Sequence, residues 1–341
     1  MSTLTETAPA AEVAGTEVEL TYRDAINAAL DDALAEDATV LLMGEDVSSD
    51  GGVFKTNAGL VEKYGRERIL NTPICENGFI GVALGMSVTG LRPIVEIMFS
   101  DFLPTAGDAI VNELPKFRFM SGGQTSVPVT VRSIAGATGR FGTQHSATGE
   151  SWYMALPGLR VAVAGSPGAA YSLLRTAIRS NDPVLFFEHK GLYGRKGVVR
   201  RGELAELGKA QVVREGADVT IVATLLMVER SLAAAKALAD DGIEAEVIDL
   251  RWLNPLDMPT VKASVQKTGR LVVAEEQPHP AGWGATVISR LAMDNVSFRA
   301  APAAVSLPDH LPISYSPPLE DAILPSPERI ADAARGAVSA R

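Results

Sequence analysis

The sequence predicts an α/β protein built from two doubly wound domains. Its 341 residues are enough for two ordinary domains, and strand-like and helix-like patterns alternate along most of the chain. Alternating strands and helices favour mostly parallel sheets covered on both faces. A basic, glycine-rich stretch without apolar periodicity, 191–208, separates two such blocks. We therefore expect domains at 20–190 and 209–341, joined by a linker at 191–208.

The first block opens with an amphipathic helix. Between residues 22 and 35, alanine, isoleucine and leucine recur at helical spacing, and Thr21 and Asp24 are suited to cap its start. An apolar, glycine-spaced helix is predicted at 78–90, and we expect it to be buried, within the domain or across a subunit interface. The other elements expected here are strands at 39–43, 93–98, 127–134, 159–163 and 183–188, and helices at 105–118 and 167–180.

The second block repeats the alternation. We expect strands at 210–214, 218–224, 244–249 and 270–275, and helices at 226–241, 257–266, 283–293 and 326–338. Segment 301–325 contains six prolines, which lack the backbone N–H that helices and sheet interiors require. We therefore expect this segment to run over the surface in an extended form.

Composition excludes several classes of function. The formal net charge of -10 argues against binding to nucleic acid or to an anionic membrane, and no apolar run reaches the ~18 residues of a membrane span. The single cysteine, Cys75, allows no internal disulfide and is expected to be a small buried apolar residue. Residues 1–19 lack arginine and lysine, so they predict a disordered tail rather than a targeting signal. A cytoplasmic location follows.

One acidic residue stands out against this background. Glu76 directly precedes the glycine-spaced helix, within the stretch NTPICENGFIGVALG. A carboxyl group in apolar surroundings is disfavoured as an anion and can exchange a proton with a bound base. On spacing alone, a solvated loop glutamate is the alternative. The chain contains no GxGxxG, P-loop, HExxH or GxSxG motif, so other familiar chemistries have no support.

Several ordered motifs resemble one family. The stretches GEDVSSDGGVF (44–54), NTPICENGFI (71–80), GLRPIVEIMFSDF (90–102), MSGG (120–123) and TQHS (143–146) resemble the beta subunit of thiamine-diphosphate-dependent 2-oxo acid dehydrogenases. IDLRWLNPL (248–256) and PPLEDAILP (317–325) are similar to the C-terminal, transketolase-like domain of that family. The resemblance covers roughly residues 20–335 and implies a transketolase-like pyrimidine-binding domain followed by a transketolase-like C-terminal domain.

The resemblance implies specific roles for four residues. Glu76 matches the carboxylic acid that hydrogen-bonds the pyrimidine ring of thiamine diphosphate and relays a proton. Met98 and Phe102 match residues that pack around this ring, where a thioether and an aromatic face suit a flat heterocycle. His145 matches a histidine at the mouth of the site, which takes part in acyl transfer to a lipoyl group.

The sequence departs from the family at three positions. Many relatives carry glutamine and histidine where this chain has Ala147 and Ala155, so the preference for acceptor or substrate is open. Some relatives hold a potassium ion with backbone carbonyls near a segment that here reads AIRSNDP (177–183), with Ser180 in place of aspartate. Potassium binding therefore stays open.

The missing motif has its own implication. The family's magnesium-binding GDG motif, followed by asparagine, does not occur in this chain. The resemblance thus implies that an alpha subunit holds Mg²⁺ and the diphosphate, in an assembly of two alpha and two beta subunits that serves a lipoyl-bearing acyltransferase. Two alternatives share the fold: an acetoin dehydrogenase beta subunit or split transketolase-like enzyme, and a non-catalytic interaction protein.

Overall fold

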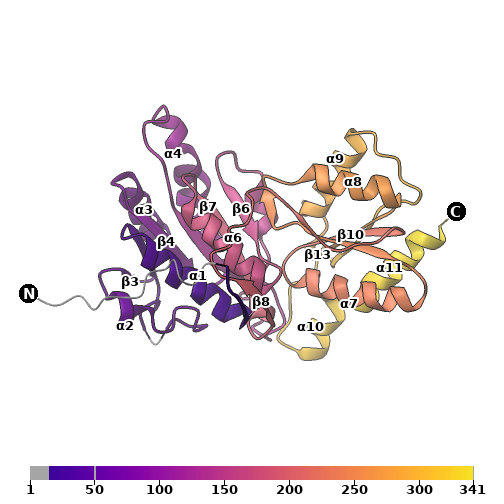
Figure 1. Cartoon of the computed structure of the whole chain (residues 1–341), viewed down its shortest axis with the longest axis horizontal. Coiled ribbons are helices and arrows are strands. Elements are labelled where there is room, and N and C mark those ends of the chain that lie inside the picture. Colours follow the sequence, from indigo (N-terminus) through magenta and orange to yellow (C-terminus); the bar gives the residue numbers. More distant parts are fainter. Residues whose placement is uncertain (1–14, 50, 341) are drawn as a thin grey trace, which may run out of the picture.

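The computed structural model describes residues 15–49 and 51–340. They form two halves that lie side by side, each a β-sheet with helices on both faces (Figure 1). The larger sheet has seven strands: β2 (Val40–Gly44), β3 (Ile69–Asn71), β4 (Arg92–Ile97), β5 (Thr130–Ala135), β6 (Arg160–Val163), β7 (Val184–His189) and β12 (Trp252–Asn254). Their order is β12-β6-β7-β5-β4-β2-β3. Every neighbouring pair is parallel except β12–β6.

Helices cover both faces of this sheet, as expected for a doubly wound domain. One face carries α1 (Tyr22–Glu36) and α6 (Pro167–Arg179), and the other carries α3 (Glu76–Val88) and α4 (Leu114–Met120). Two short helices, α2 (Leu60–Tyr64) and α5 (Glu150–Met154), lie in the connections. The prediction for α1 is confirmed, since the Thr21 side chain accepts a hydrogen bond from the Asp24 N–H at 3.1 Å.

The predicted helix at 105–118 is broken into three pieces. A 3₁₀ segment, η2 (Ser100–Ala106), and a π-helical turn, η3 (Ala109–Glu113), precede α4. Pro104 lies in η2 and Pro115 at the start of α4. Because neither proline can donate a backbone hydrogen bond, one regular α-helix cannot run through the segment.

The second sheet has five strands: β9 (Gln211–Arg214), β10 (Val219–Ala223), β11 (Ala245–Asp249), β13 (Leu271–Pro278) and β14 (Ala303–Leu307). Their order is β14-β13-β10-β11-β9, parallel except for β9. One face carries α7 (Leu226–Asp240) and α11 (Pro327–Ser339), and the other carries α8 (Met258–Thr268) and α9 (Trp283–Met293). The fold class predicted from the sequence is therefore confirmed.

The proline-rich segment is more ordered than predicted. Residues 303–307 form the edge strand β14, and residues 317–323 form α10 (Pro317–Ile323). The extended-surface prediction is wrong for these two stretches. Pro317 and Pro318 lie in the first turn of α10, where a missing N–H costs no hydrogen bond.

Two further expectations fail where distant segments meet. Strand β1 (Glu17–Thr21) pairs antiparallel with β8 (Lys196–Arg200), so residues 17–19 are not a disordered tail and the linker contains a strand. Residues 1–14 of the predicted tail lie outside the described part of the chain. Between β7 and β8 lies a 3₁₀ turn, η4 (Lys190–Leu192).

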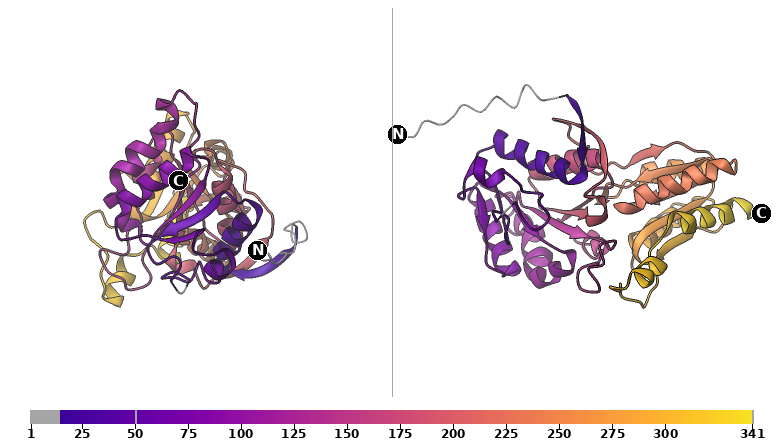
Figure 2. Two further views of the ribbon diagram at one scale, coloured as in Figure 1. Left: turned by 90° about the vertical axis from the view of Figure 1, so that its left-hand side faces the viewer. Right: turned by 90° about the horizontal axis from the view of Figure 1, so that it is seen from below.

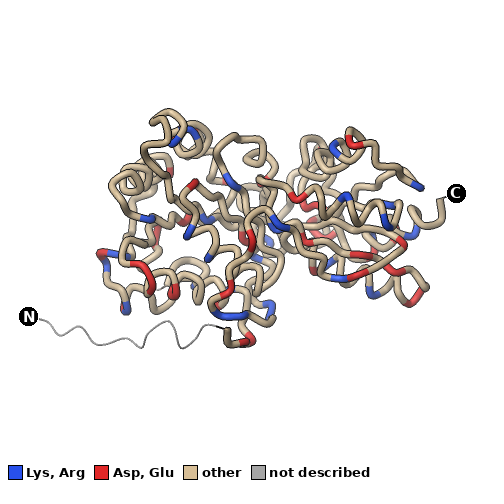
Figure 3. The backbone as a smooth tube through the Cα atoms, turned by 45° about the horizontal axis from the view of Figure 1, so that its top comes forward, with Lys and Arg blue, Asp and Glu red and all other residues tan. Residues whose placement is uncertain are grey.

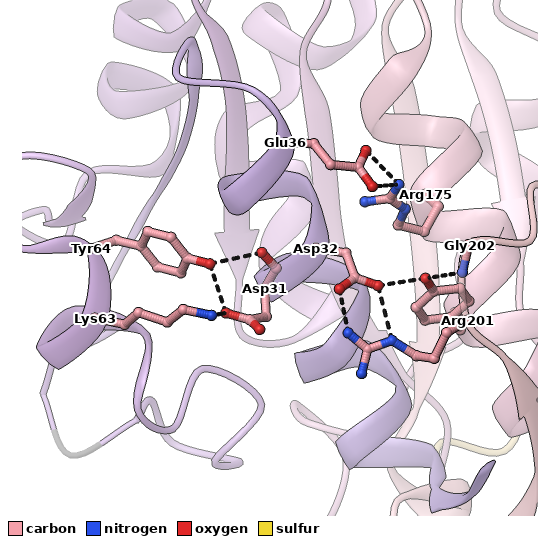
Figure 4. A network of polar contacts seen from close by, with 9 residues as sticks. Asp31, Asp32, Glu36, Lys63, Tyr64, Arg175, Arg201 and Gly202 are labelled. Atoms are coloured by element: carbon pink, nitrogen blue, oxygen red, sulfur yellow. Dashed lines mark hydrogen bonds and ion pairs between the residues drawn. The ribbon is translucent and has the colours of Figure 1, made fainter. Parts of the chain in front are cut away.

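Polar side chains of α1 bind residues of α6 and the segment just after β8 (Figure 4). The Asp32 carboxylate binds Arg201, just after β8, and accepts a hydrogen bond from Tyr171 at 2.5 Å. One turn further, Glu36 accepts two hydrogen bonds of 2.7 Å from Arg175. The segment 196–202 is thus held against α1 of the first half.

The two halves share their packing. One hydrophobic cluster joins the α1/α6 side of the first sheet to the α7/α11 side of the second, and another joins the α3/α4 side to α8 and α9. Strand β12, from the second half, completes the edge of the first sheet by pairing with β6. The right-hand view in Figure 2 shows the two halves of the chain side by side.

Acidic and basic positions are interspersed over both halves of the described chain (Figure 3). No helix in residues 15–49 or 51–340 combines the length and the apolar character needed to cross a membrane.

Helix α3 is only half buried by the described residues of this chain, so packing within the domain accounts for one of its sides. Phe79, Ile80, Ala83 and Leu84 face the core, whereas Val82 is 51% exposed on the opposite face. Just before the helix, Ile74 is 82% exposed and Cys75 is also exposed, so the prediction of a buried cysteine is wrong. The apolar pattern runs around the whole helix, and the described residues cover only one side of it.

Candidate functional site

All four predicted site residues follow strands at one edge of the larger sheet. Because β2, β3, β4, β5 and β7 are parallel, their carboxyl ends share an edge, which is where open α/β sheets bind ligands. Glu76 follows β3, Met98 and Phe102 follow β4, and His145 lies in the loop after β5. The topology therefore gathers residues that are up to 69 positions apart, by the numbering of Glu76 and His145.

The structure brings Phe102 and His145 together. Their ring centroids lie 5.4 Å apart at nearly right angles, with the edge of one ring towards the face of the other. Phe99, which the sequence analysis did not single out, lies 4.7 Å from His145 and 5.7 Å from Phe102. Phe99 is buried, so it forms a fixed wall behind the imidazole. Its place within MFSDF, between Met98 and Phe102, was the available signal.

Lys190 is a second residue that the sequence analysis missed. It follows β7, and its ammonium group donates a hydrogen bond to the His145 carbonyl oxygen. The Nζ atom lies 5.3 Å from the centre of the Phe99 ring and 5.0 Å from that of Phe141, within the range of cation–π attraction. Burial lowers the pKa of Lys190 to about 8, although Asp101, Glu276 and Glu320 oppose this shift.

Glu76 begins helix α3 and is half-buried. Its carboxylate makes no hydrogen bond or ion pair with any residue that the structure describes, and it lies where the positive end of the helix dipole favours an anion. Glu45, directly after β2, is its acidic neighbour. Burial is the main cause that raises the pKa of Glu45, and the negative charges of Glu76 and Asp46 raise it further. One buried Glu45 oxygen, Oε1, also has no partner among the described residues.

Met98 is half-buried at the end of β4, one residue before Phe99. Hydrogen bonds and ion pairs among the described residues link neither Met98 nor Glu76 to His145. The structure therefore brings Phe102 and His145 into ring contact, and it places Glu76 and Met98 along the same sheet edge.

The two alanines that depart from the family occupy different settings. The backbone of Ala147 is held on both sides: its carbonyl oxygen accepts from Ser100 at 2.6 Å, and its N–H donates to Asp101 at 3.2 Å. Ala155 is exposed and ends α5. A side chain at 147 would thus project from a rigid backbone beside His145, whereas position 155 lies on the surface.

These residues fit the aminopyrimidine half of thiamine diphosphate. Glu76 offers a carboxylate, and Glu45 an oxygen beside it, that are unpaired among residues 15–49 and 51–340, and Phe102 adds a flat apolar wall on the same edge. A carboxyl group accepts a hydrogen bond when ionised and donates one when protonated, so it can bind a ring nitrogen in either protonation state. In the described part of the chain, no group of three or more His, Cys, Asp or Glu residues could hold a metal ion.

Two carbonyl oxygens and one carboxylate of segment 177–183 already bind guanidinium groups. The Arg92 guanidinium donates to the carbonyl oxygens of Ile178 at 3.2 Å and Ser180 at 3.0 Å. The Asp182 carboxylate pairs with Arg160 at 2.6 Å and with Arg118. Guanidinium groups thus supply the positive charge that these oxygens attract.

A buried acidic cluster lies next to the His145 loop. Glu150, the first residue of α5, is 1% exposed, and its Oε2 atom has no partner among the described residues. Burial raises its pKa to about 8; its own backbone N–H opposes this, and the charges of Glu275 and Glu276 on β13 add to it. Glu150 is therefore neutral in the folded protein at neutral pH.

This cluster predicts a pH dependence of stability. Between the ordinary pKa of 4.5 and the folded value of about 8, the folded protein retains a proton on Glu150 that the unfolded chain has released. The free energy of unfolding should therefore fall as pH rises through this window. We expect Glu150→Gln to flatten the profile and to be more stable than the wild type near pH 8, measured by urea unfolding at several pH values. The exposed Glu203→Gln is the control; a Glu150→Gln profile parallel to the wild type would contradict the assignment.

Comparisons with known proteins match both halves of the chain. Residues 18–196 match the family model described as "Transketolase, pyrimidine binding domain", and residues 208–330 match "Transketolase, C-terminal domain". The acetoin:2,6-dichlorophenolindophenol oxidoreductase subunit beta of Cupriavidus necator is 42% identical over 330 residues, covering 93% of this chain and 97% of the relative. The mitochondrial pyruvate dehydrogenase E1 component subunit beta of Pisum sativum is 43% identical over 324 residues, covering 94% and 90%.

A solved structure is similar over nearly the whole chain. It is described as a split gene transketolase, inactive beta4 tetramer, and it superposes with a TM-score of 0.79 at 26% identity. The match covers 94% of this chain and 99% of that one.

Proposed function

The chain belongs to the family of beta subunits of pyruvate dehydrogenase E1 components and acetoin oxidoreductases, and on this premise we propose that it supplies the pyrimidine side of a thiamine diphosphate site in a 2-oxo acid dehydrogenase. The observation that carries the proposal is Glu76, an unpaired carboxylate among the described residues at a helix start. It lies on the same sheet edge as the Phe102–His145 ring pair.

Each site residue has a defined task in this proposal. When bound, thiamine diphosphate would supply the carbon nucleophile for the keto group of a 2-oxo acid. Glu76 holds and returns a proton at the pyrimidine ring nitrogen, and the start of α3 stabilises its ionised form. Met98 and Phe102 pack against the ring and exclude water from it. His145, held edge-on by Phe99, moves protons at the mouth of the site during transfer of the acyl group to lipoamide.

The chain is proposed to work with an alpha subunit. Val82 on the free side of α3 and Ile74, two residues before Glu76, are exposed apolar side chains. A second subunit packed on these side chains would bury them and enclose Glu76 from the open side. That subunit would bring Mg²⁺ and the groups that hold the diphosphate, in an assembly of two alpha and two beta subunits. The acyl acceptor is a lipoyl-bearing acyltransferase, and the compartment is the cytoplasm.

Reconstitution tests this proposal. The purified chain should be inactive alone, and active when the alpha subunit, thiamine diphosphate and Mg²⁺ are added. Steady-state turnover would be measured with a panel of 2-oxo acids, acetoin and sugar phosphates. Activity with a 2-oxo acid supports the proposal. Activity with sugar phosphates alone would contradict it, and no turnover together with no cofactor binding would indicate a non-catalytic interaction protein.

Acetoin cleavage is the second candidate. It is favoured by the Cupriavidus necator relative, of which this chain covers 97%. Turnover of acetoin without turnover of any 2-oxo acid would support this candidate over the first.

The occupied oxygens of segment 177–183 predict an enzyme independent of potassium. Since Arg92 already donates to Ile178 and Ser180, replacing K⁺ by Na⁺ in the assay should change neither turnover nor thermal stability. The control is Arg92→Met, which frees both carbonyl oxygens. A wild-type enzyme that needs K⁺ for activity would contradict this prediction.

A further inference from the structure

The loop that carries His145 is held by the second half of the chain. Several of its backbone and side-chain groups bond to that half. The Ala137 N–H donates to Glu276 at 2.7 Å, the Thr138 N–H donates to Glu320 at 2.7 Å, and the Thr143 hydroxyl donates to the Ile313 carbonyl at 3.0 Å. Ala137 also packs with Leu307, Ile313 and Leu324 in a small hydrophobic cluster. The position of His145 therefore depends on residues about 130–180 positions away in the sequence.

Glu320 on α10 is the centre of this attachment. Its side chain is completely buried, and both carboxylate oxygens are used. Oε1 accepts from the Thr138 N–H, and Oε2 accepts from the Arg140 guanidinium at 2.5 Å. The neighbouring Asp321 also binds Arg140, but the Asp321 side chain is 63% exposed. The Glu320 carboxylate is thus the buried end of this contact, although the Arg140 side chain is itself 38% exposed.

The two loop residues that Glu320 holds have an unfavourable backbone conformation. Thr138 has a φ of 75° and Arg140 a φ of 58°, in the left-handed region. For a β-branched residue such as threonine this conformation is rare and costs energy. Residues with strained backbone angles persist only where contacts with the surrounding structure stabilise those angles, and they concentrate at functional sites. The contacts from Glu320 stabilise the strained angles of Thr138 and Arg140.

We propose that Glu320 is a positioning residue for His145: it holds Thr138 and Arg140 in a strained loop conformation that fixes the imidazole against Phe99. This inference rests on the proposed role of His145. Without Glu320, the loop would relax towards ordinary backbone angles, and the imidazole would lose its fixed position over the mouth of the site. The PPLEDAILP motif thereby acquires a role in the reaction, although it lies in the second half of the chain.

The test uses Glu320→Gln in the enzyme reconstituted with its alpha subunit. Glutamine has the same shape, but it has one acceptor oxygen, and its amide group would face a donor on Thr138 or Arg140. Acyl transfer to a lipoyl domain should fall at least about tenfold, within the ~100-fold that a 1 Å misplacement can cost. Substrate oxidation coupled to an artificial dye, which bypasses this transfer, should change less than about twofold. Asp321→Asn is the matched control and should leave both rates unchanged.

Two double variants separate positioning from a merely structural role. Glycine adopts positive φ without strain, so Thr138→Gly should restore much of the transfer rate in the Glu320→Gln background. Glu320→Gln should add no further loss to His145→Ala if it acts through His145. Where Glu320→Gln fails to assemble, Arg140→Gln removes one of its contacts from the exposed side and carries the same expectation.

The outcomes distinguish the inference from its premise. A normal transfer rate in His145→Ala would overturn the proposed role of His145 itself. A slow His145→Ala with a normal Glu320→Gln would overturn only the positioning role. Equal losses in the lipoyl and dye assays, or multiplying losses in the double variant, would also overturn it.

Discussion

Replacing Glu76 with glutamine is expected to lower the turnover of the reconstituted enzyme by roughly 10²- to 10⁴-fold, the usual contribution of a positioned acid–base group. Glutamine keeps the length and shape of the side chain, but it cannot release and regain a proton. Because Glu76 makes no hydrogen bond or ion pair with the described part of this chain, the substitution should leave the fold intact. Steady-state turnover of the 2-oxo acid gives the measurement.

The control is Glu62→Gln, which changes an exposed glutamate in the first turn of the nearby helix α2. It should turn over as the wild type does. Sedimentation with the alpha subunit should show the same assembly for both variants. A Glu76→Gln enzyme with normal turnover would show that the proton relay has been assigned to the wrong residue.

Replacing Arg132 with methionine is expected to cost about 3–5 kcal/mol of folding stability, the range for breaking a buried ion pair. Arg132 lies on the central strand β5 and is 1% exposed. It pairs with Glu96 on β4 at 3.0 Å and with Glu188 on β7 at 2.6 Å, and so joins three neighbouring strands. Burial raises the pKa of Glu188, and the guanidinium counteracts this shift. Methionine would leave two buried carboxylates without their counter-charge.

Urea unfolding of the isolated chain provides the measurement. The loss should shrink at acidic pH, since protonation of the two carboxylates removes the buried charge. Arg179→Met is the control, because Arg179 is 60% exposed and its contact with Glu36 is long, at 3.5 Å. That variant should lose less than about 1 kcal/mol, as exposed pairs do. Equal losses in the two variants would contradict the importance of the buried cluster.

Local patterns predicted the elements that depend on local physics. The amphipathic spacing and the Thr21 cap identified α1 to within one residue at its end, because a helix is stabilised by contacts three and four residues apart. The alternation of strands and helices predicted the parallel sheets and, with them, the sheet edge on which Glu76, Met98, Phe102 and His145 lie. The domain boundaries and the roles of these four residues stay predictions.

Predictions failed where long-range contacts override local preference. The β1–β8 pair joins segments about 180 residues apart, and nothing in either segment specifies the other. Cys75 and one face of α3 are exposed although their residue types suggested burial, since no residue in 15–49 or 51–340 covers that face. Phe99 and Lys190 could be identified as site residues only from their contacts with His145 in the folded chain.

By itself, the sequence determined the α/β class and the presence of a carboxylate before a glycine-spaced helix, because both follow from residue types at short spacing. Only the tertiary structure decided how the site is held. Three contacts join residues that are far apart in the chain. Glu320 is buried against a strained loop, the ammonium group of Lys190 lies near two aromatic rings, and the Arg92 guanidinium binds carbonyl oxygens in 178–180. Their energies depend on burial and distance, which exist only after the chain has folded.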